Sequence, residues 1–377
     1  MTKKEGEEDL FRAYAELDPF KRVAQFYARQ TAGNLERHGI YEISASRGES
    51  AYLVVLPDGT GLAHVDEGLG TKVLVADAMH LITGRCYYDA IGQDTVAMIV
   101  NDMATVGAQP VMVGMHIASG DGKWFEEDAE RAEALCRGWA SACTMAGAAW
   151  GGGETPALQD IVYTNAVVLS GSATGTIESS GHPILGGRLM AGDVLFGLPS
   201  SGIHANGLTM ARAVGAKRGY DALLPSGRMY GEALLTPTPI YAQFVALLLA
   251  NGLLPSYIMN ITGHGWRKLM RHAGPFAYII EDIPVPQEEF EFIQQNYVDD
   301  KTGLNPSTEQ MYGSFNMGLG YVFAMSSAQA DAFERLALDA GTGFIRLGHV
   351  EVAGDRRKRV EIRPRDITFK AESLQIR

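Results

Sequence analysis

The sequence places an amide and a carboxylate at the end of an apolar run. Residues 96–100 lead directly into Asn101 and Asp102, and Asp94 lies seven residues before Asn101. If this segment is a helix, Asp94 and Asn101 share one face and Asp102 lies beside it. Three polar groups on an apolar helix each need hydrogen-bond partners of their own, or they share one metal or nucleotide site. The shared site is the preferred interpretation.

A second cluster combines acidic residues, glycines and a lysine in residues 66–72, Asp-Glu-Gly-Leu-Gly-Thr-Lys. Gly68 and Gly70 permit close backbone approach, and Thr71 offers a hydroxyl group. Lys72 is a point charge that suits phosphate, and Glu67 is an oxygen ligand of the kind that Mg²⁺ prefers. The spacing is not that of a Walker motif. A surface turn is an equally good interpretation of this segment.

Two glycine-containing segments could present polar groups to a ligand. Three glycines precede Glu154, which suggests a loop that lets this carboxylate reach an adjacent site. Residues 199–207, Pro-Ser-Ser-Gly-Ile-His-Ala-Asn-Gly, lie between a predicted strand and a predicted helix, where hydroxyl and N–H groups can hold an anion. The alternatives are a flexible connection for the first segment and helix capping by Asn206 for the second.

A third loop, residues 260–265, reads Asn-Ile-Thr-Gly-His-Gly. His264 lies between glycines and is therefore predicted to be accessible. It is a candidate for acid–base chemistry or phosphate binding, because its ordinary pKa lies near neutral pH. An inert loop histidine is the alternative.

Composition limits the classes of protein in which these residues can act. The chain has 377 residues, which suggests two domains. A net charge of −12 argues against a general nucleic-acid or membrane-surface binder. Three cysteines without C-x-x-C spacing fit a reducing compartment, and the charged N-terminus has no apolar signal core. We therefore expect a cytoplasmic protein.

The elements that must position these residues mix strands and helices in both halves, which favours α+β over all-parallel α/β. Residues 8–30 have helical spacing, with a predicted break at Asp18-Pro19. Periodicity predicts the other helices over 72–80, 95–106, 128–146, from 208, 239–250, 266–272 and 328–340. It predicts strands over 51–56, 111–117, 161–170, 194–198, 277–280, 320–324 and 346–352.

Glycine, serine and proline become frequent near residues 175–190, where we place a domain boundary. The predicted units are an N-terminal helical segment over 1–50, a domain over 51–178 and a second domain over 179–377. A basic run, residues 356–359, could be a nucleic-acid signal. The preferred interpretation is the solvated turn of a hairpin between 349–352 and 360–362.

Taken in order, these segments resemble the aminoimidazole ribonucleotide synthetase (PurM-like) superfamily. Residues 102–110 resemble its D-x4-G-A-x-P signature, and residues 67–72 resemble D-G-V-G-T-K with Glu67 in place of aspartate. The remaining motifs G-G-E-T, S-S-G-x-H-S-N-G, L-x-P-T, I-T-G and F-N-x-G are similar to residues 152–155, 200–207, 235–238, 261–263 and 315–318. Seven motifs in the right order are highly specific, and the second-half motifs resemble the phosphoribosylformylglycinamidine cyclo-ligase branch.

The resemblance implies a two-domain PurM-like fold. Two chains would form a homodimer in which their N-terminal sheets close a β-barrel, followed by a C-terminal α/β sandwich domain. It implies binding of ATP and Mg²⁺ and of a small phosphorylated substrate, with no nucleic acid and no membrane. ATP would phosphorylate the formyl oxygen of formylglycinamidine ribonucleotide, and a nitrogen would then expel phosphate and close the imidazole ring of aminoimidazole ribonucleotide.

The resemblance also implies roles for individual residues. The expected nucleotide-binding residues are Glu67, Gly68, Gly70, Thr71, Lys72, Asp94, Asn101, Asp102 and Glu154. The expected metal ligands are Glu67, Asp94 and Asp102. The expected substrate contacts are Ser201, His204, Asn206 and Thr262, and the expected catalytic residues are Lys72, Asn260 and His264, with His264 as the base.

Three departures from the family pattern leave the substrate open. Asn260 stands where the family usually has histidine, and His264 stands where it usually has glycine. The family's N-terminal lysine has no counterpart after Ala32-Gly33-Asn34, and its glycine-rich N-terminal loop is absent. The alternatives are another ATP-dependent amide-activating enzyme of the superfamily, or a non-catalytic nucleotide-binding relative.

Overall fold

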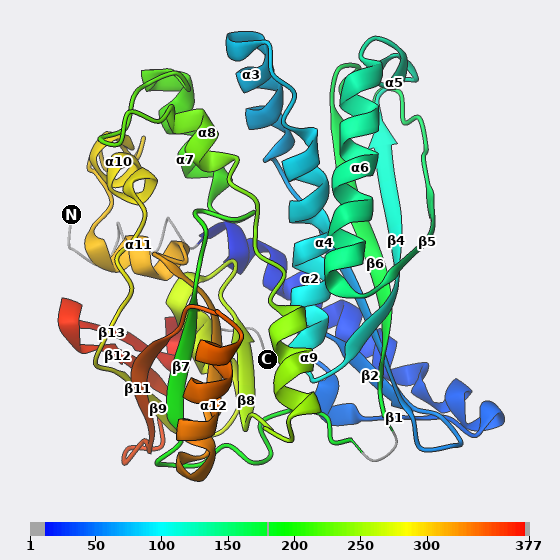
Figure 1. The fold of residues 1–377 in the computed structure, drawn as a ribbon, viewed down its shortest axis with the longest axis vertical. Coiled ribbons are helices and arrows are strands. Elements are labelled where there is room, and N and C mark those ends of the chain that lie inside the picture. The colour runs from blue at the N-terminus through cyan, green and yellow to red at the C-terminus, as the bar shows by residue number, and fades with distance from the viewer. Residues whose placement is uncertain (1–11, 179–180, 374–377) are drawn as a thin grey trace.

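Two mixed β-sheets, one in each half of the chain, form the framework of the computed structural model, which describes residues 12–178 and 181–373 (Figure 1). The first sheet has the strand order β1-β2-β3-β6-β4-β5. Its strands are β1 (Tyr41–Glu42), β2 (Tyr52–Val55), β3 (Gly61–Gly68), β4 (Gln109–Ser119), β5 (Ala149–Glu154) and β6 (Val167–Ile177). Only β4 and β5 run parallel within this sheet.

One face of the first sheet is covered by helices and the other is open. Side chains along β6 alternate between buried and partly exposed positions, as expected for a strand with one covered face. Two long helices, α4 (Tyr88–Ala104) and α6 (Ala129–Ala146), pack closely together in this half of the molecule. Their close approach requires glycine, because a Cβ on Gly138 would lie 2.1 Å from the Asp89 carbonyl oxygen. The other helices of this half are α3 (Val73–Thr83) and the short α5 (Lys123–Glu126).

The second sheet has the strand order β13-β12-β9-β11-β7-β10-β8. These strands are β7 (Val194–Pro199), β8 (Tyr257–Asn260), β9 (Phe276–Ile280), β10 (Leu319–Met325), β11 (Ile345–Val352), β12 (Arg359–Ile362) and β13 (Ile367–Lys370). The accompanying helices are α7 (Leu208–Arg218), α8 (Tyr230–Leu234), α9 (Ala242–Ala250), the 3₁₀ helix η3 (Gly265–Arg271), α10 (Glu288–Asn296), α11 (Thr308–Ser314) and α12 (Ser327–Asp339). Aromatic side chains build its core, with Phe196 stacked on Phe333 at a centroid separation of 4.4 Å.

Helix α4 lies at the junction of the two halves (Figure 1). It contacts β3 and β6 of the first sheet and α9 of the second half. Its apolar residues are buried, which explains why the run at 96–100 is apolar on every side. The α+β architecture with two domains is therefore confirmed. Because α4 lies in the buried junction, its polar residues must find hydrogen-bond or ion-pair partners within the protein.

Several expected elements differ in the structure. The predicted break at Asp18-Pro19 is wrong, because α2 (Arg12–Gln30) continues through Pro19, and residues 8–11 lie outside the described residues. Residues 151–154 form part of strand β5 rather than a loop, since β4 supplies their pairing partner. The strand expected over 161–170 begins only at Val167, and the helix expected over 266–272 is the 3₁₀ helix η3.

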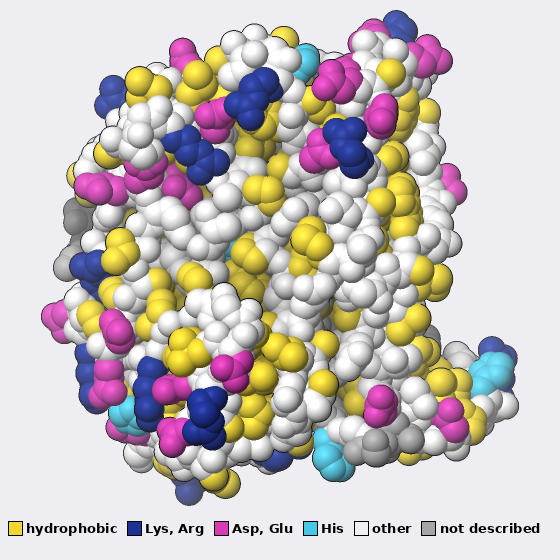
Figure 2. All heavy atoms as spheres, viewed as in Figure 1, with side chains coloured by type: hydrophobic (Ala, Val, Ile, Leu, Met, Phe, Trp, Pro, Cys, Tyr) yellow, Lys and Arg dark blue, Asp and Glu magenta, His cyan; other side chains and the backbone are white. Residues whose placement is uncertain are grey.

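The predicted hairpin around the basic run is also wrong. Strands β11 and β12 do not pair with each other, because β9 lies between them. Strand β12 pairs with β9 in parallel orientation and with β13 in antiparallel orientation. Arg359 forms ion pairs with Glu361 and Asp355, so part of the basic charge is compensated locally. On the face shown in Figure 2, acidic and basic side chains are interspersed. No helix among the described residues is long and apolar enough to cross a membrane.

Candidate active site

The first polar group of α4, Asp94, is bound by residues that are distant in sequence. Its Oδ1 accepts hydrogen bonds from the backbone N–H and the hydroxyl of Thr238, at 2.9 and 2.5 Å. Its Oδ2 lies 2.6 Å from Lys72 Nζ, in an ion pair that lacks the alignment of a hydrogen bond. Lys72 Nζ also donates to the Thr236 carbonyl oxygen at 3.1 Å. Both charged side chains are 0% exposed, so neither can contact a ligand unless residues 236–238 move.

The second polar group, Asn101, is satisfied by the start of α9. Its Oδ1 accepts hydrogen bonds from the backbone N–H groups of Tyr241 and Ala242, at 2.7 and 3.2 Å. Its Nδ2 donates to the Pro239 carbonyl oxygen at 2.8 Å. Free N–H groups at a helix start need such an acceptor. Asn101 therefore connects the two halves, and both the oxygen and the nitrogen of its side-chain amide take part in that connection.

The third polar group, Asp102, meets a different environment. Its Oδ1 accepts a hydrogen bond from Asn260 Nδ2 at 2.7 Å. The carboxyl group of Glu67, at the end of β3, lies beside it. Burial, the charge of Asp102 and a hydrogen bond shared with Asp102 raise the pKa of Glu67 to about 7, while Lys268 acts to lower it. Asp102 and Glu67 are thus a close carboxyl pair, called the acidic pair below.

The predicted three-carboxylate metal site is not assembled. Glu67 and Asp102 are brought together, whereas both oxygens of Asp94 face Lys72 and Thr238. Among residues 12–178 and 181–373, no three His, Cys, Asp or Glu side chains are arranged to hold a metal ion. The acidic pair nevertheless fits Mg²⁺, which is commonly held by one or two carboxylates together with substrate phosphates. The mutual repulsion of two carboxylates is the electrostatic situation that a cation relieves.

The loop at 199–207, between β7 and α7, is held in place by the expected F-N-x-G segment. Asn316 Nδ2 donates to the Gly202 carbonyl oxygen at 2.8 Å, and Asn316 Oδ1 accepts from Ser200 Oγ at 3.0 Å. Ser201 Oγ donates to the Pro237 carbonyl oxygen at 2.6 Å. The motifs around Ser200, Pro237 and Asn316 therefore meet in space, although more than 100 residues separate the first from the last.

His204 is buried in this loop rather than directed outward. Its Nε2 accepts a hydrogen bond from the Ser201 backbone N–H at 3.3 Å. Burial, together with the charge of Lys72, lowers the pKa of His204 to about 3, so the imidazole is neutral at pH 7. Asn206 is half-buried immediately before α7. In this conformation His204 supports the loop, and a direct contact with substrate stays a prediction, as it does for Ser201 and Asn206.

Three non-glycine residues with positive φ lie in three of the motif loops. They are His204 at φ 59°, His264 at 77° and Met317 at 48°. Left-handed backbone at non-glycine residues costs free energy and is concentrated at functional sites. The loops at 199–207, 260–265 and 315–318 are therefore shaped by the surrounding structure.

His264 is poorly suited to the role of base. Burial and the nearby charges of Arg267 and Lys268 lower the pKa of His264 to about 3. A general base works best with a pKa near the working pH. Thr262, in the same loop, accepts a hydrogen bond from Lys268 Nζ. From the second half of the chain, Asn260 thus contacts Asp102, and the charge of Lys268 acts to lower the pKa of Glu67.

Sequence reasoning missed two charged residues near these loops, Lys268 and Glu289. Glu289 lies in the first turn of α10 and is 3% exposed, and burial raises its pKa to about 7. A Cβ on Gly202 would lie 2.8 Å from Glu289 Oε1, so this carboxyl group abuts the 199–207 loop. The segment Gln-Glu-Glu-Phe-Glu looks like an exposed acidic helix start. No helix was predicted here, and the only signal was the apolar spacing of Phe290 and Ile293, beside which Glu289 lies in α10.

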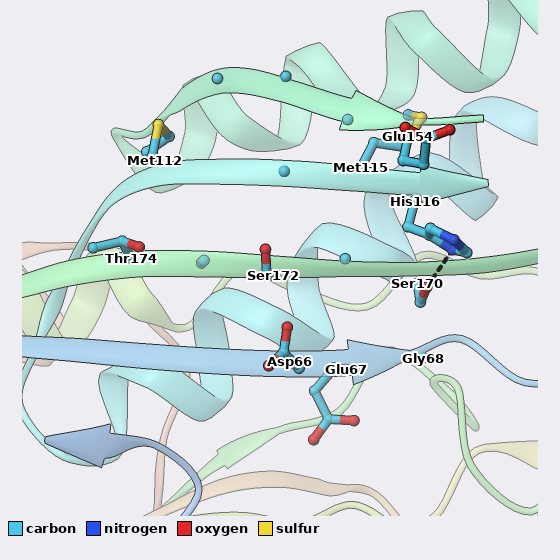
Figure 3. A pocket seen from close by; sticks show the side chains of 16 residues that line it. Asp66, Glu67, Gly68, Met112, Met115, His116, Glu154, Ser170, Ser172 and Thr174 are labelled. Atoms are coloured by element: carbon cyan, nitrogen blue, oxygen red, sulfur yellow. Dashed lines mark hydrogen bonds between the residues drawn. The ribbon is translucent and has the colours of Figure 1, made fainter. Parts of the chain in front are cut away.

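Glu154 lies on the open face of the first sheet, in a hollow of about 780 Å³ (Figure 3). Asp66, His116 and Ser170 also line the hollow, and His116 Nδ1 lies 3.1 Å from Ser170 Oγ. In Figure 3 the side chains of Asp66 and Glu67 point to opposite sides of β3. Gly68 lines the hollow, and Gly70 (φ 76°) and Thr71 form the turn into α3. Glu67 also lines this hollow, but its side chain points to the side of β3 opposite that of Asp66, so the hollow meets the acidic pair only at Glu67.

Comparison with known proteins identifies relatives over most of the chain. The model of the AIR synthase related protein family matches with its N-terminal domain over residues 48–177 and its C-terminal domain over residues 190–361. The phosphoribosylformylglycinamidine cyclo-ligase of Sorangium cellulosum is 35% identical over 84% of this chain and 88% of its own length. That of Bifidobacterium animalis is 36% identical over 75% of this chain and 79% of its own.

Solved structures share the fold at low identity. AaThiL complexed with AMPPCP and TMP has a TM-score of 0.59 at 15% identity, covering 95% of this chain and 98% of its own. The hydrogenase maturation protein HypE in complex with ATP has a TM-score of 0.57 at 16% identity, covering 83% and 85%. At these identities the structures support the fold and carry no residue roles.

Proposed function

The chain belongs to the AIR synthase related family, and from this we propose that it is an ATP-dependent cyclo-ligase that converts formylglycinamidine ribonucleotide to aminoimidazole ribonucleotide. The observation that carries the proposal is identity of 31–36% to relatives named phosphoribosylformylglycinamidine cyclo-ligase over most of the chain. Their names do not favour the two alternatives, another amide-activating enzyme or a non-catalytic relative.

The chemistry requires an amide oxygen to become a leaving group. Transfer of a phosphoryl group from ATP to the formyl oxygen creates that leaving group, and attack by the substrate's nitrogen on the same carbon expels phosphate and closes the ring. Mg²⁺, when bound, neutralises phosphate charge during the transfer. We assign Glu67 and Asp102 as its ligands, with Asn260 fixing the orientation of Asp102 through the 2.7 Å hydrogen bond. Asp94 is left out of this set because Lys72 and Thr238 occupy its oxygens.

The substrate phosphate is assigned to the 199–207 loop. Asn316 holds this loop at Ser200 and Gly202, which leaves the half-buried Asn206 as the candidate contact, while Ser201 contributes only if it exchanges its hydrogen bond to Pro237 for one to the phosphate. A preformed loop lowers the entropic cost of binding. Lys72 is assigned a supporting role beneath the loop, because its ammonium group is buried against Asp94. His264 is assigned to positioning rather than to proton transfer, because its pKa is about 3.

We further propose that the working form is a homodimer in which the open faces of two first sheets meet. Strand β5 is exposed along its length, and Met112, Trp150 and Val168 expose apolar side chains on this sheet. An exposed edge strand with apolar neighbours favours association. A second copy would cover the hollow that holds Glu154. We place this dimer in the cytoplasm.

The test is an assay with formylglycinamidine ribonucleotide, ATP and Mg²⁺. We expect aminoimidazole ribonucleotide, ADP and phosphate in equal amounts, and no ADP release when the substrate is omitted. Folded protein that binds ATP and forms no product would reject the proposed activity. Sedimentation at micromolar concentration tests the dimer separately, and a monomer would reject that part alone.

A further inference from the structure

We propose that Gln287 is a positioning residue for the loop at 199–207, and that its side-chain amide holds Ser200 so that N–H groups further along the loop can bind a phosphate. The proposal rests on the proposed function in one respect, the assignment of the substrate phosphate to this loop. Gln287 stands at the start of α10, in a segment that none of the sequence motifs includes.

Ser200 is the fixed point of this loop. It is 6% exposed, and its backbone N–H donates to the Gly318 carbonyl oxygen at 2.8 Å. Gln287 Nε2 donates to the Ser200 carbonyl oxygen at 2.6 Å, and Ser200 Oγ lies 3.3 Å from Gln287 Oε1 and 3.0 Å from Asn316 Oδ1. Side chains from two separate elements, the start of α10 and the segment after α11, therefore hold this one residue.

The start of α10 is shaped to hold the loop rather than to cap its own helix. Gln287 is the N-cap residue of α10, where a polar side chain commonly accepts a hydrogen bond from an N–H group of the first turn. Within the described first turn the Gln287 side chain forms no such bond, and both of its polar atoms pair with Ser200. The next turn position, Glu289, abuts the loop at Gly202, so α10 packs directly against it.

Two carbonyl groups of the loop are held by side-chain amides, whereas N–H groups beyond them are unoccupied. Gln287 binds the carbonyl oxygen of Ser200, and the F-N-x-G segment binds that of Gly202 at 2.8 Å. None of the described residues accepts a hydrogen bond from the backbone N–H groups of Ala205 and Gly207, which lead into α7. A phosphate is bound by N–H groups and repelled by carbonyl oxygens, so both features favour an anion at this loop.

Loss of the Gln287 amide would free the carbonyl group of Ser200. The loop would then have to be ordered at the moment when the phosphate binds, and this ordering lowers the affinity for the phosphate. The nucleotide is assigned to the acidic pair, which Gln287 does not contact, so its binding should not change. A rise in the KM of the phosphorylated substrate with little change in kcat is the signature of such a binding effect.

The experiment measures binding of ribose 5-phosphate to the full chain by isothermal titration calorimetry and, separately, binding of a non-hydrolysable ATP analogue with Mg²⁺. Wild type is compared with Gln287→Met, which removes both hydrogen bonds, and with Gln287→Asn, whose amide is one methylene too short to reach Ser200. Gln294→Met is the matched control, because Gln294 lies on the same helix and donates to the Pro306 carbonyl oxygen at 3.2 Å rather than to the loop. Circular dichroism verifies that each variant is folded.

We expect Gln287→Met and Gln287→Asn to bind ribose 5-phosphate about tenfold more weakly than wild type, because the hydrogen bonds that order the loop are lost. Their affinity for the ATP analogue should be unchanged, and Gln294→Met should match wild type for both ligands. Equal affinity of wild type and the Gln287 variants for ribose 5-phosphate would overturn the proposal. An equal loss of affinity for the ATP analogue would also overturn it, because it indicates general damage to the fold.

Turnover gives a second measurement, and Gln287→Asn keeps it informative if Gln287→Met does not fold. In the cyclo-ligase assay, the KM for formylglycinamidine ribonucleotide should rise about tenfold while kcat changes little. A fall in kcat at unchanged KM would contradict the positioning role. Absence of product, with an affinity for ribose 5-phosphate that depends on Gln287, would reject the cyclo-ligase alone. Product formation by wild type that does not bind ribose 5-phosphate would reject the role of Gln287 alone.

Discussion

Two sites along α4 carry the same kinds of residue and use them differently. Near the middle of the helix, Asp94 forms an ion pair with Lys72, both side chains are 0% exposed, and Thr238 and Thr236 of the second half complete their contacts. At the C-terminal end of the helix, Asp102 is paired with another carboxyl group, Glu67, whose pKa is raised to about 7 although Lys268 acts to lower it. The balanced, dry ion pair is part of the contact between the two halves, whereas the carboxyl pair retains the capacity to bind a cation. Charge balance, more than residue type, separates the structural site from the candidate active site.

The largest effect is expected at the balanced ion pair of Asp94 and Lys72. Asp94→Asn keeps an oxygen for Thr238 but leaves the Lys72 ammonium group buried without its counter-ion. Removing one member of a buried pair costs about 3–5 kcal/mol. Urea unfolding of the variant should show this loss in the free energy of unfolding.

The double variant Lys72→Met/Asp94→Asn is the control for that prediction. It removes the stranded charge, and it should therefore recover most of the lost stability. A stability of Asp94→Asn within 1 kcal/mol of wild type would show that the pair does not hold the domains together.

The next effect is expected on turnover, at the carboxyl pair of Asp102 and Glu67. Asp102→Asn removes the charge that the proposed metal ion needs, while an amide oxygen can still accept the Asn260 hydrogen bond. We expect kcat to fall by about 10²–10³-fold, as for the loss of one electrostatic contact to the transition state. The free energy of unfolding should change little, because repulsion from Glu67 is also removed. Near-normal turnover would exclude Asp102 from the active site.

Much of this comparison could be predicted from the sequence, and its decisive part could not. The apolar run before Asn101 predicted α4, and the motif order predicted that Asp102 and Glu67 belong together. The partners of Asp94 and Asn101 lie about 140 residues away, and spacing along a helix carries no information about them. Asp94, Asn101 and Asp102 consequently have separate hydrogen-bond partners rather than one shared ligand site. This was the alternative that the sequence analysis did not prefer. A metal or nucleotide site is not needed to explain Asp94 or Asn101.

Local signals failed where pairing partners come from elsewhere. Strand β5 reads as a loop because Gly151, Gly152 and Gly153 have no strand propensity, and only β4 makes it a strand. The hairpin at 349–362 was wrong because β9, about 70 residues earlier, inserts between its two strands. Lys268, which is 8% exposed, was missed for the same reason. Burial by a distant segment is a property of the fold, so these residues were found only in the structure.

Another buried carboxyl group, Glu289, sharpens the contrast between compensated and uncompensated charge. Glu289 has no ion-pair partner among the described residues, and burial raises its pKa from 4.5 to about 7. The folded state thus holds this proton more tightly than the unfolded state. Stability from this group is full below pH 4.5 and is lost as pH rises through 7, by on the order of 3 kcal/mol.

Glu289→Gln removes that titration. Between pH 5 and 8, wild type should lose stability relative to the variant, and urea midpoints at several pH values measure the difference. Parallel pH profiles for wild type and Glu289→Gln would show that Glu289 is ionised at little cost in the folded protein.

The smallest effect is expected at His264, where the property tested is backbone strain rather than charge. His264 has φ 77°, a conformation that glycine adopts without strain, so His264→Gly should relieve strain. The greater freedom of glycine in the unfolded chain offsets part of this gain, and the net stabilisation should be about 0–1 kcal/mol. Since the pKa of His264 is about 3, we expect kcat within a few-fold of wild type. A general base would instead cost about 10²–10⁴-fold.

His204→Gly is the matched variant for this test. His204 also has a positive φ, of 59°, but its Nε2 accepts the Ser201 N–H and its ring packs near Tyr241. The same relief of strain is therefore outweighed by an unsatisfied donor and a cavity, and we expect a net loss of about 2–4 kcal/mol. If His264→Gly instead abolishes turnover while remaining folded, proton transfer returns to His264, and the unbalanced cluster around Glu67 and Asp102 then extends to the 260–265 loop.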